Sequence, residues 1–185
     1  INSYFKVNIY GVRMRQWWDS VNKEFPPFPT ITNNNFEQNV KPIYVYSNSH
    51  PFFANNQATG NDLNAIVVEG NIQSDTTWEK DLVYIVMSRS IVPQNATLTI
   101  NPGVIVKFYD RYSGMVIQGT LKAIGEQDDP IVFTTLNDDD VGYGGDTNGD
   151  NGQNLAVPGA WLGFYFSNNA TNLSELNYTV LRYGG

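Results

Sequence analysis

The sequence contains no cysteine among its 185 residues. This absence excludes disulfide bonds, thiol catalysis and thiolate metal sites, although it assigns no cellular compartment. Charge is also sparse, because Asp, Glu, Lys and Arg make up only 16% of the residues, and the formal net charge is -7. An acidic chain of this kind argues against a nucleic-acid partner, which would need a basic stripe. It remains compatible with divalent cations or with solubility alone.

Long apolar runs are missing as well. None approaches the roughly 18 residues that a membrane-spanning helix requires, so we expect no membrane span. Histidine occurs once, as His50 in "NSHPF". No serine or cysteine motif accompanies it in the sequence, and nucleophilic catalysis depends on such a partner. A single histidine in a loop is more often structural than catalytic, and we expect that role for His50.

Helix signals are scarce. The stretch "VRMRQWWDSVNKEF" (Val12–Phe25) predicts a short N-terminal helix, which the prolines of "FPPFP" would end. Elsewhere, short runs of β-branched and aromatic residues are separated by Gly, Asn, Asp and Pro, a pattern typical of strands ended by tight turns. Aromatic residues of the N-terminal segment either bury the helix or form a platform for sugar rings. They are Trp17, Trp18, Phe25 and Phe28.

The spacing of the expected strands favours a solenoid, in which each coil of the chain stacks on the previous one. Strand centres near Thr99, Ile117 and Phe133 lie about 16 to 18 residues apart, close to a coil length. The next strand, near Phe164, follows after about 30 residues, which is one coil plus an insertion of about 14 residues. Some of the expected strands alternate apolar and polar residues, whereas others are apolar throughout, as expected for parallel strands covered on both faces.

Several motifs occur in a fixed order along the C-terminal two thirds of the chain. They are "TTWEKDLVYIVMSRSIVPQNATLTINPGVIVKF", "GTLKAIGEQDDPIVFTT", "DTNGD", "PGAWLGFYF" and "VLRYGG". Together they resemble the right-handed parallel β-helix domains of secreted and cell-surface proteins, the pectate-lyase-like solenoids. The resemblance covers residues 64–185 and implies an all-β, right-handed parallel β-helix. Residues 1–63 are similar to the end coils of a preceding β-helix, interrupted by the helical, proline-rich segment.

The interior of these coils should be filled by the apolar residues of the strands. We expect burial of Leu98, Ile100, Val104, Val106, Val116, Leu121, Ile131, Phe133, Trp161 and Phe164. Asparagines at repeated corners should adopt left-handed conformations and stack as hydrogen-bonded ladders. Glycines at Gly103, Gly114, Gly119 and Gly125 suit corners that need a positive φ.

An acidic insertion at residues 136–160 is the strongest candidate for a binding site. Its core "DTNGDNG" places side-chain oxygens at Asp146, Asn148 and Asp150, the alternate spacing that wraps oxygen ligands around Ca²⁺. The start of the insertion supplies further candidate ligands, Asp138, Asp139 and Asp140. The sequence therefore predicts a calcium site that orders the insertion. The alternative is a solvated insertion that consists of turns and binds no metal.

Two other interpretations of the insertion are excluded by its details. An EF-hand would need glycine where Asn151 stands and glutamate where Val157 stands. A phosphate cradle would need a lysine after the glycines, and the carboxylates would repel the anion.

The predicted function is a non-catalytic structural or adhesive module of an extracellular or cell-surface protein, part of a surface or filament-forming assembly. The alternative is a polysaccharide-active enzyme, a lyase or hydrolase, or a carbohydrate-binding module of the same fold. Candidate groups for that chemistry are Lys107, Asp110 and Arg111 in "VKFYDRY", although alternating exposed charges at a strand end explain them equally well. The fold alone does not decide between these functions.

Both ends of the sequence resemble strands, "INSYFKVNIYG" at the start and "TVLRYGG" at the end. Unpaired strands at the ends of a solenoid invite pairing with another chain or domain. We therefore expect either a piece of a longer solenoid or a subunit that associates end to end with itself or with neighbouring β-helix domains.

Overall fold

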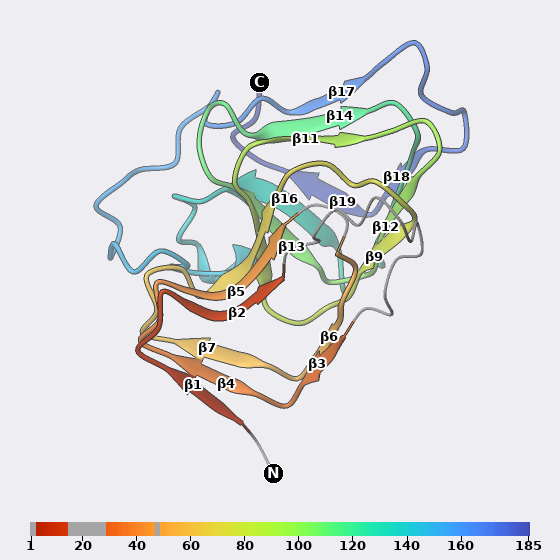
Figure 1. The fold of residues 1–185 in the computed structure, drawn as a ribbon. Helices are drawn as coiled ribbons and strands as arrows, with labels where there is room; N and C mark the ends of the chain where they lie inside the picture. The colour runs from red at the N-terminus through yellow and green to blue at the C-terminus, as the bar shows by residue number, and fades with distance from the viewer. Residues whose placement is uncertain (1–2, 15–28, 47–48) are drawn as a thin grey trace.

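The computed structural model describes residues 3–14, 29–46 and 49–185, and within them the chain winds through stacked coils of a parallel β-helix (Figure 1). Every pairing between named strands is parallel. This confirms the all-β parallel β-helix that the sequence predicts. One seven-stranded sheet, called the long sheet below, continues through all the coils in the order β19-β16-β13-β10-β8-β5-β2.

The long sheet is formed by β2 (Tyr10–Met14), β5 (Lys41–Tyr46), β8 (Ala65–Glu69), β10 (Val83–Val86), β13 (Ile105–Phe108), β16 (Ile131–Thr135) and β19 (Thr179–Leu181). Two further sheets close the C-terminal coils. They consist of β9 (Thr76–Trp78), β12 (Thr97–Ile100), β15 (Thr120–Ile124) and β18 (Glu175–Asn177), and of β11 (Arg89–Val92), β14 (Gly114–Ile117) and β17 (Phe164–Phe166). The N-terminal coils are closed by β1 (Tyr4–Lys6), β4 (Asn35–Glu37) and β7 (Gln57–Thr59), and by β3 (Thr30–Thr32) and β6 (Phe52–Ala54).

Most coils are longer than the predicted 16 to 18 residues, although Ile66 of β8 pairs with Tyr84 of β10, 18 positions further on. Ser90 pairs with Met115, which is 25 positions further on, and the ladder asparagines contact each other at separations of 22 residues. The sequence-based spacing was wrong because it compared β12, β14 and β16, which belong to three different sheets of the coil. The insertion is accordingly longer than expected, since Met115 pairs with Phe164, 49 positions on.

The predicted N-terminal helix is wrong over its first residues, because Val12–Met14 lie in β2. Val12 pairs with Ile43 and Met14 with Val45, and both apolar side chains pack against the coil interior. Arg13 between them is exposed, so the two-residue alternation of a strand prevails there over the helical pattern. The rest of the predicted helix, with Trp17, Trp18, Phe25 and Phe28, lies outside the described residues. The helix that the structure shows in the described ranges is a 3-10 turn, η1 (Val141–Tyr143).

The predicted core is confirmed. Nine of its members are buried, namely Leu98, Ile100, Val104, Val106, Val116, Leu121, Ile131, Phe133 and Trp161. Phe164 is half-buried and packs against the same cluster. Aromatic contacts fix the last coils: the rings of Phe108 and Trp161 stack with centroids 4.0 Å apart, and Phe133 meets Phe164 edge to face at 4.8 Å. Such pairs add about 0.5–1.5 kcal/mol each beyond the area they bury.

Asparagine ladders run along two corners of the N-terminal coils, as predicted. The expected left-handed conformation is wrong for the ladder residues, since Asn33 and Asn55 beside one ladder have the positive φ. In one ladder, Asn39 Nδ2 donates to Asn61 Oδ1 at 3.0 Å. In the other, Asn34 Nδ2 donates to Asn56 Oδ1 at 3.1 Å, and Asn56 Nδ2 donates to Asp81 Oδ2 at 2.6 Å. Because these amides are buried or half-buried, the ladders satisfy polar groups that would otherwise oppose the stacking of the coils.

The glycines at the corners serve two different purposes. Gly103 has a φ of +73°, as expected for a corner in the left-handed region. The expectation was wrong for Gly114, Gly119 and Gly125, whose φ lies outside that region. Gly119 is instead required for close approach, since a Cβ there would lie 2.1 Å from the carbonyl oxygen of Pro93.

The burial of Phe133 provides a test of this core. We expect Phe133→Ala to lower the free energy of unfolding by about 3–5 kcal/mol, because a fully buried ring leaves a cavity between stacked coils. Urea denaturation measures the change. The matched control is Phe52→Ala, since Phe52 is 49% exposed, and this variant should stay close to wild type. Equal losses for the two variants would contradict the assigned interior.

Candidate metal centre

The outer face of the long sheet is covered rather than exposed. The strand register places Tyr44, Val67, Ile85, Lys107 and Thr134 in one row across five neighbouring strands. In this row Tyr44, Val67 and Ile85 belong to a second buried apolar cluster, separate from the coil interior. Burial on both faces explains why strands of this sheet are apolar throughout.

The acidic insertion, residues 136–160, is attached to this outer face through Lys107. The Lys107 side chain is fully buried, and its Nζ donates to the carbonyl oxygens of Asp138 at 2.7 Å and Gly145 at 2.5 Å. Burial lowers the pKa of Lys107 to about 8, against the opposing influence of nearby carboxylates, of which that of Asp138 is the strongest. A backbone bond from the Asn64 amide to the Thr147 carbonyl ties the insertion to a second coil.

Two of the predicted metal ligands, Asp138 and Asp140, are engaged with protein groups. Asp138 Oδ2 accepts a hydrogen bond from Thr134 Oγ1 at 2.6 Å and lies 3.4 Å from Arg182 Nε. Asp140 Oδ2 lies 3.4 Å from Nη1 of the same arginine, whose guanidinium stacks on the ring of Tyr143 at 3.9 Å. These two carboxylates therefore hold the start of the insertion in place.

The other aspartates converge. One carboxylate oxygen from each of Asp139, Asp146 and Asp150 lies within 4.8 Å of the others. Both side-chain oxygens of Asp139, and Oδ1 of Asn148, are shielded from solvent and accept no hydrogen bond from the described residues. Buried oxygens without a donor are rare in folded proteins and call for a partner. Of the three aspartates predicted at the start of the insertion, the fold thus brings Asp139 to the residues that the "DTNGD" spacing predicts.

Backbone amides fix the orientation of two of these carboxylates. Asp146 accepts hydrogen bonds from the amides of Asp150 at 3.1 Å and Asn151 at 2.9 Å. Asp150 accepts from the Gly152 amide at 2.8 Å and from Asn154 Nδ2 at 2.6 Å. The loop is therefore an ordered turn, with its carboxylates already directed to one point.

The electrostatics of this cluster favour a cation. Burial, followed by the negative charges of Asp146 and Asp150, raises the pKa of Asp139. The hydrogen bond from Asn154 is the largest of the influences that lower the pKa of Asp150, so this group stays ionised. Three carboxylates and an amide oxygen are hard ligands, and these residues fit the preference of Ca²⁺ for oxygen donors from flexible loops. A divalent cation between them would offset the mutual repulsion of the carboxylates.

The candidate catalytic groups of the sequence "VKFYDRY" do not come together. Lys107 is buried beneath the insertion, whereas Asp110 accepts hydrogen bonds from the amides of Tyr112 and Ser113 in its own turn. Arg111 lies over the ring of Tyr112. His50, expected to be structural, contacts the side chains of two residues of the next coil, which the sequence did not associate with it.

The family model of the pectate-lyase like beta helix domain matches residues 70–178, more than half of the chain. The architecture defines a parallel β-helix with an acidic insertion over its long sheet, and the chain belongs to this pectate-lyase-like family. Comparison with curated proteins and with solved structures gave no match. In the described ranges, no helix has the length and apolar character needed to cross a membrane.

Lys107 can be tested by replacement. We expect Lys107→Met to lower the free energy of unfolding by about 1–3 kcal/mol, because the carbonyls of Asp138 and Gly145 lose their donor while remaining covered. Urea denaturation measures the loss, and limited proteolysis should show faster cleavage within residues 136–160. Lys122→Met, at an exposed position of β15, is the control. If both variants behave like wild type, Lys107 does not anchor the insertion.

Proposed function

We propose that this chain is a structural or adhesive module of an extracellular or cell-surface protein, whose acidic insertion is ordered by Ca²⁺. The observation that carries the proposal is the convergence of Asp139, Asp146 and Asp150, together with the shielded, unpartnered oxygens of Asp139 and Asn148. Extracellular modules bind Ca²⁺ with dissociation constants of about 10⁻⁴–10⁻³ M, which a small oxygen-ligand site of this kind can reach.

The insertion needs such a cation because it buries little apolar surface of its own. Three of its apolar side chains, Val141, Leu155 and Val157, are exposed. Its order depends instead on Lys107, on Arg182 and on the turn around Asp150. A cation that binds only the folded loop adds stability through mass action.

End-to-end association belongs to the same proposal. Within the described residues, β2 and β19 form the two edges of the long sheet, and edge strands offer unpaired backbone groups for pairing. Apolar side chains beside these edges, such as Val7, Ile9 and Leu181, are exposed. Both features support association with a second copy or with a neighbouring β-helix domain, as in a surface or filament-forming assembly.

Calcium dependence is best tested with Asp139→Asn. In chelator this variant should melt at a higher temperature than wild type, because it removes a charge that Asp146 and Asp150 repel. In saturating Ca²⁺ the order should reverse, because wild type gains about 2.7 kcal/mol at a hundredfold excess over the dissociation constant while the variant loses a ligand.

Differential scanning fluorimetry with and without Ca²⁺, and calorimetric titration of the chelated protein, measure both effects. Asp128→Asn, an exposed carboxylate outside the cluster, is the control and should keep the full response to Ca²⁺. A wild-type melting temperature that Ca²⁺ leaves unchanged would support the metal-free insertion instead.

A groove beside the metal centre supports a second candidate function, carbohydrate binding. It has a volume of about 520 Å³. Its polar lining includes Lys41, Asp62 and Asn137, and Tyr109 adds an aromatic ring that is 42% exposed. Polar groups around an accessible ring suit a sugar, which stacks its apolar face and hydrogen-bonds through its hydroxyls. The groove also reaches the metal centre, because Asn148 lines it.

Calorimetric titration with neutral and uronic-acid oligosaccharides tests this function. We expect Tyr109→Ala to weaken binding of the oligosaccharide that binds wild type, because the stacking surface is lost. Tyr112→Ala is the matched control, since Tyr112 is also exposed but lies outside the groove lining. Absence of binding by wild type, with and without Ca²⁺, would leave only the structural role.

A further inference from the structure

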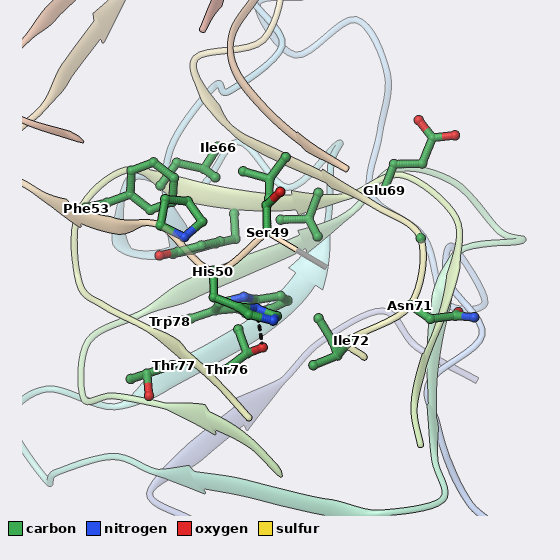
Figure 2. A pocket seen from close by; sticks show the side chains of 15 residues that line it. Ser49, His50, Phe53, Ile66, Glu69, Asn71, Ile72, Thr76, Thr77 and Trp78 are labelled. Carbon is green, nitrogen blue, oxygen red and sulfur yellow. Dashed lines mark hydrogen bonds between the residues drawn. The ribbon is translucent and has the colours of Figure 1, made fainter. Parts of the chain in front are cut away.

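The side chain of His50 lies beside a small cavity at the edge of the coil interior (Figure 2). The cavity has a volume of about 20 Å³. Apolar side chains form most of its lining, among them Val45, Ile66, Val68 and Trp78. His50 belongs to the segment after β5, whereas the two hydroxyl groups that it contacts belong to Ser74 and Thr76 of the next coil, 24 and 26 residues further on.

The hydrogen bonds of this group assign the proton positions. Thr76 Oγ1 donates its single proton to the carbonyl oxygen of Ser74 at 2.8 Å. We place the ring proton on His50 Nδ1, because the same oxygen lies 2.6 Å from this nitrogen and can then act as acceptor. Nε2 is left with its lone pair and faces Ser74 Oγ at 2.5 Å. The hydroxyl of Ser74 thus donates to a basic nitrogen.

The surroundings keep this base neutral near pH 7. Burial lowers the pKa of His50, and the nearby carboxylate of Asp75 opposes that shift. Glu69 also lines the cavity, but its carboxylate is engaged by the hydroxyl of Tyr44. A neutral imidazole that accepts from a serine, while a further hydroxyl orients the ring, has the connectivity of a serine–histidine nucleophilic centre.

We propose that Ser74 is a nucleophile for acyl transfer, with His50 as its general base and Thr76 as the residue that positions the ring. This activity goes beyond the structural role and does not rest on it. The substrates that this chemistry fits are carboxylic esters.

The reaction uses only the ester and water. Ser74 Oγ forms a bond to the carbonyl carbon while its proton moves to His50 Nε2. The bond between that carbon and the leaving oxygen breaks, and the alcohol departs with the proton from Nε2. Water then adds to the acyl carbon and gives a proton to Nε2. Finally the bond to Ser74 Oγ breaks, the carboxylic acid leaves and the serine regains its proton.

Covalent labelling tests the proposal directly. The protein is treated with diisopropyl fluorophosphate, which phosphorylates activated serines, and the adduct is located by intact mass and peptide mapping. We expect a single adduct on Ser74, absent from Ser74→Ala. Ser49→Ala is the matched control, since this serine lines the cavity beside His50, and it should label like wild type. An unlabelled wild type, or an adduct on another residue, would overturn the proposal.

The roles of the partners are tested by rates. The labelling rate should rise with pH through a midpoint below 6.5, because the neutral form of His50 is the base. His50→Gln should lower the labelling rate at least about 100-fold, as expected for a lost general base. Thr76→Val should slow labelling and Thr76→Ser should restore it, whereas a merely structural threonine would change only the melting temperature. A wild-type labelling rate in His50→Gln would contradict the assignment.

Discussion

The buried amine of Lys107 determines how the acidic insertion lies on the β-helix. It occupies the outer face of the long sheet at a position where the neighbouring strands carry Ile85 and Thr134, and it donates to carbonyls at two separate points of the insertion. A charge in such a place is costly unless hydrogen bonds and opposite charges compensate for the lost hydration. The carbonyls of Asp138 and Gly145, with the carboxylates behind them, supply the compensation. The loop and the sheet therefore depend on each other.

This constraint also explains why the aspartates of the insertion have different roles. Whereas Asp138 is held by Thr134 and Arg182, the carboxylate of the next residue, Asp139, lies close to those of Asp146 and Asp150. The carboxylates that anchor the loop are thus separate from those that form the candidate metal centre. Binding of Ca²⁺ would change the stability of the loop without disturbing its attachment to the sheet.

Coil length has a second consequence, because it decides which distant residues become neighbours. Separations of 22 residues stack asparagine on asparagine at the corners. Similar separations, of 24 and 26 residues, bring His50 next to Ser74 and Thr76. The separation of paired residues in the observed register would have indicated that His50, Ser74 and Thr76 are neighbours. The spacing of successive strands did not indicate this, because those strands lie in different sheets.

The sequence by itself determined the parallel β-helix and the interior residues, and it predicted three residues of the candidate metal centre, Asp146, Asn148 and Asp150. These follow from local patterns: apolar runs between turn residues, and oxygen donors at alternate positions of one loop. Only the tertiary structure selected Asp139 from three consecutive aspartates, buried Lys107 and joined His50 to Ser74. These arrangements depend on the number of residues between paired positions of successive coils and on the face of the sheet that a side chain occupies. No local spacing in the sequence encodes either of these two properties.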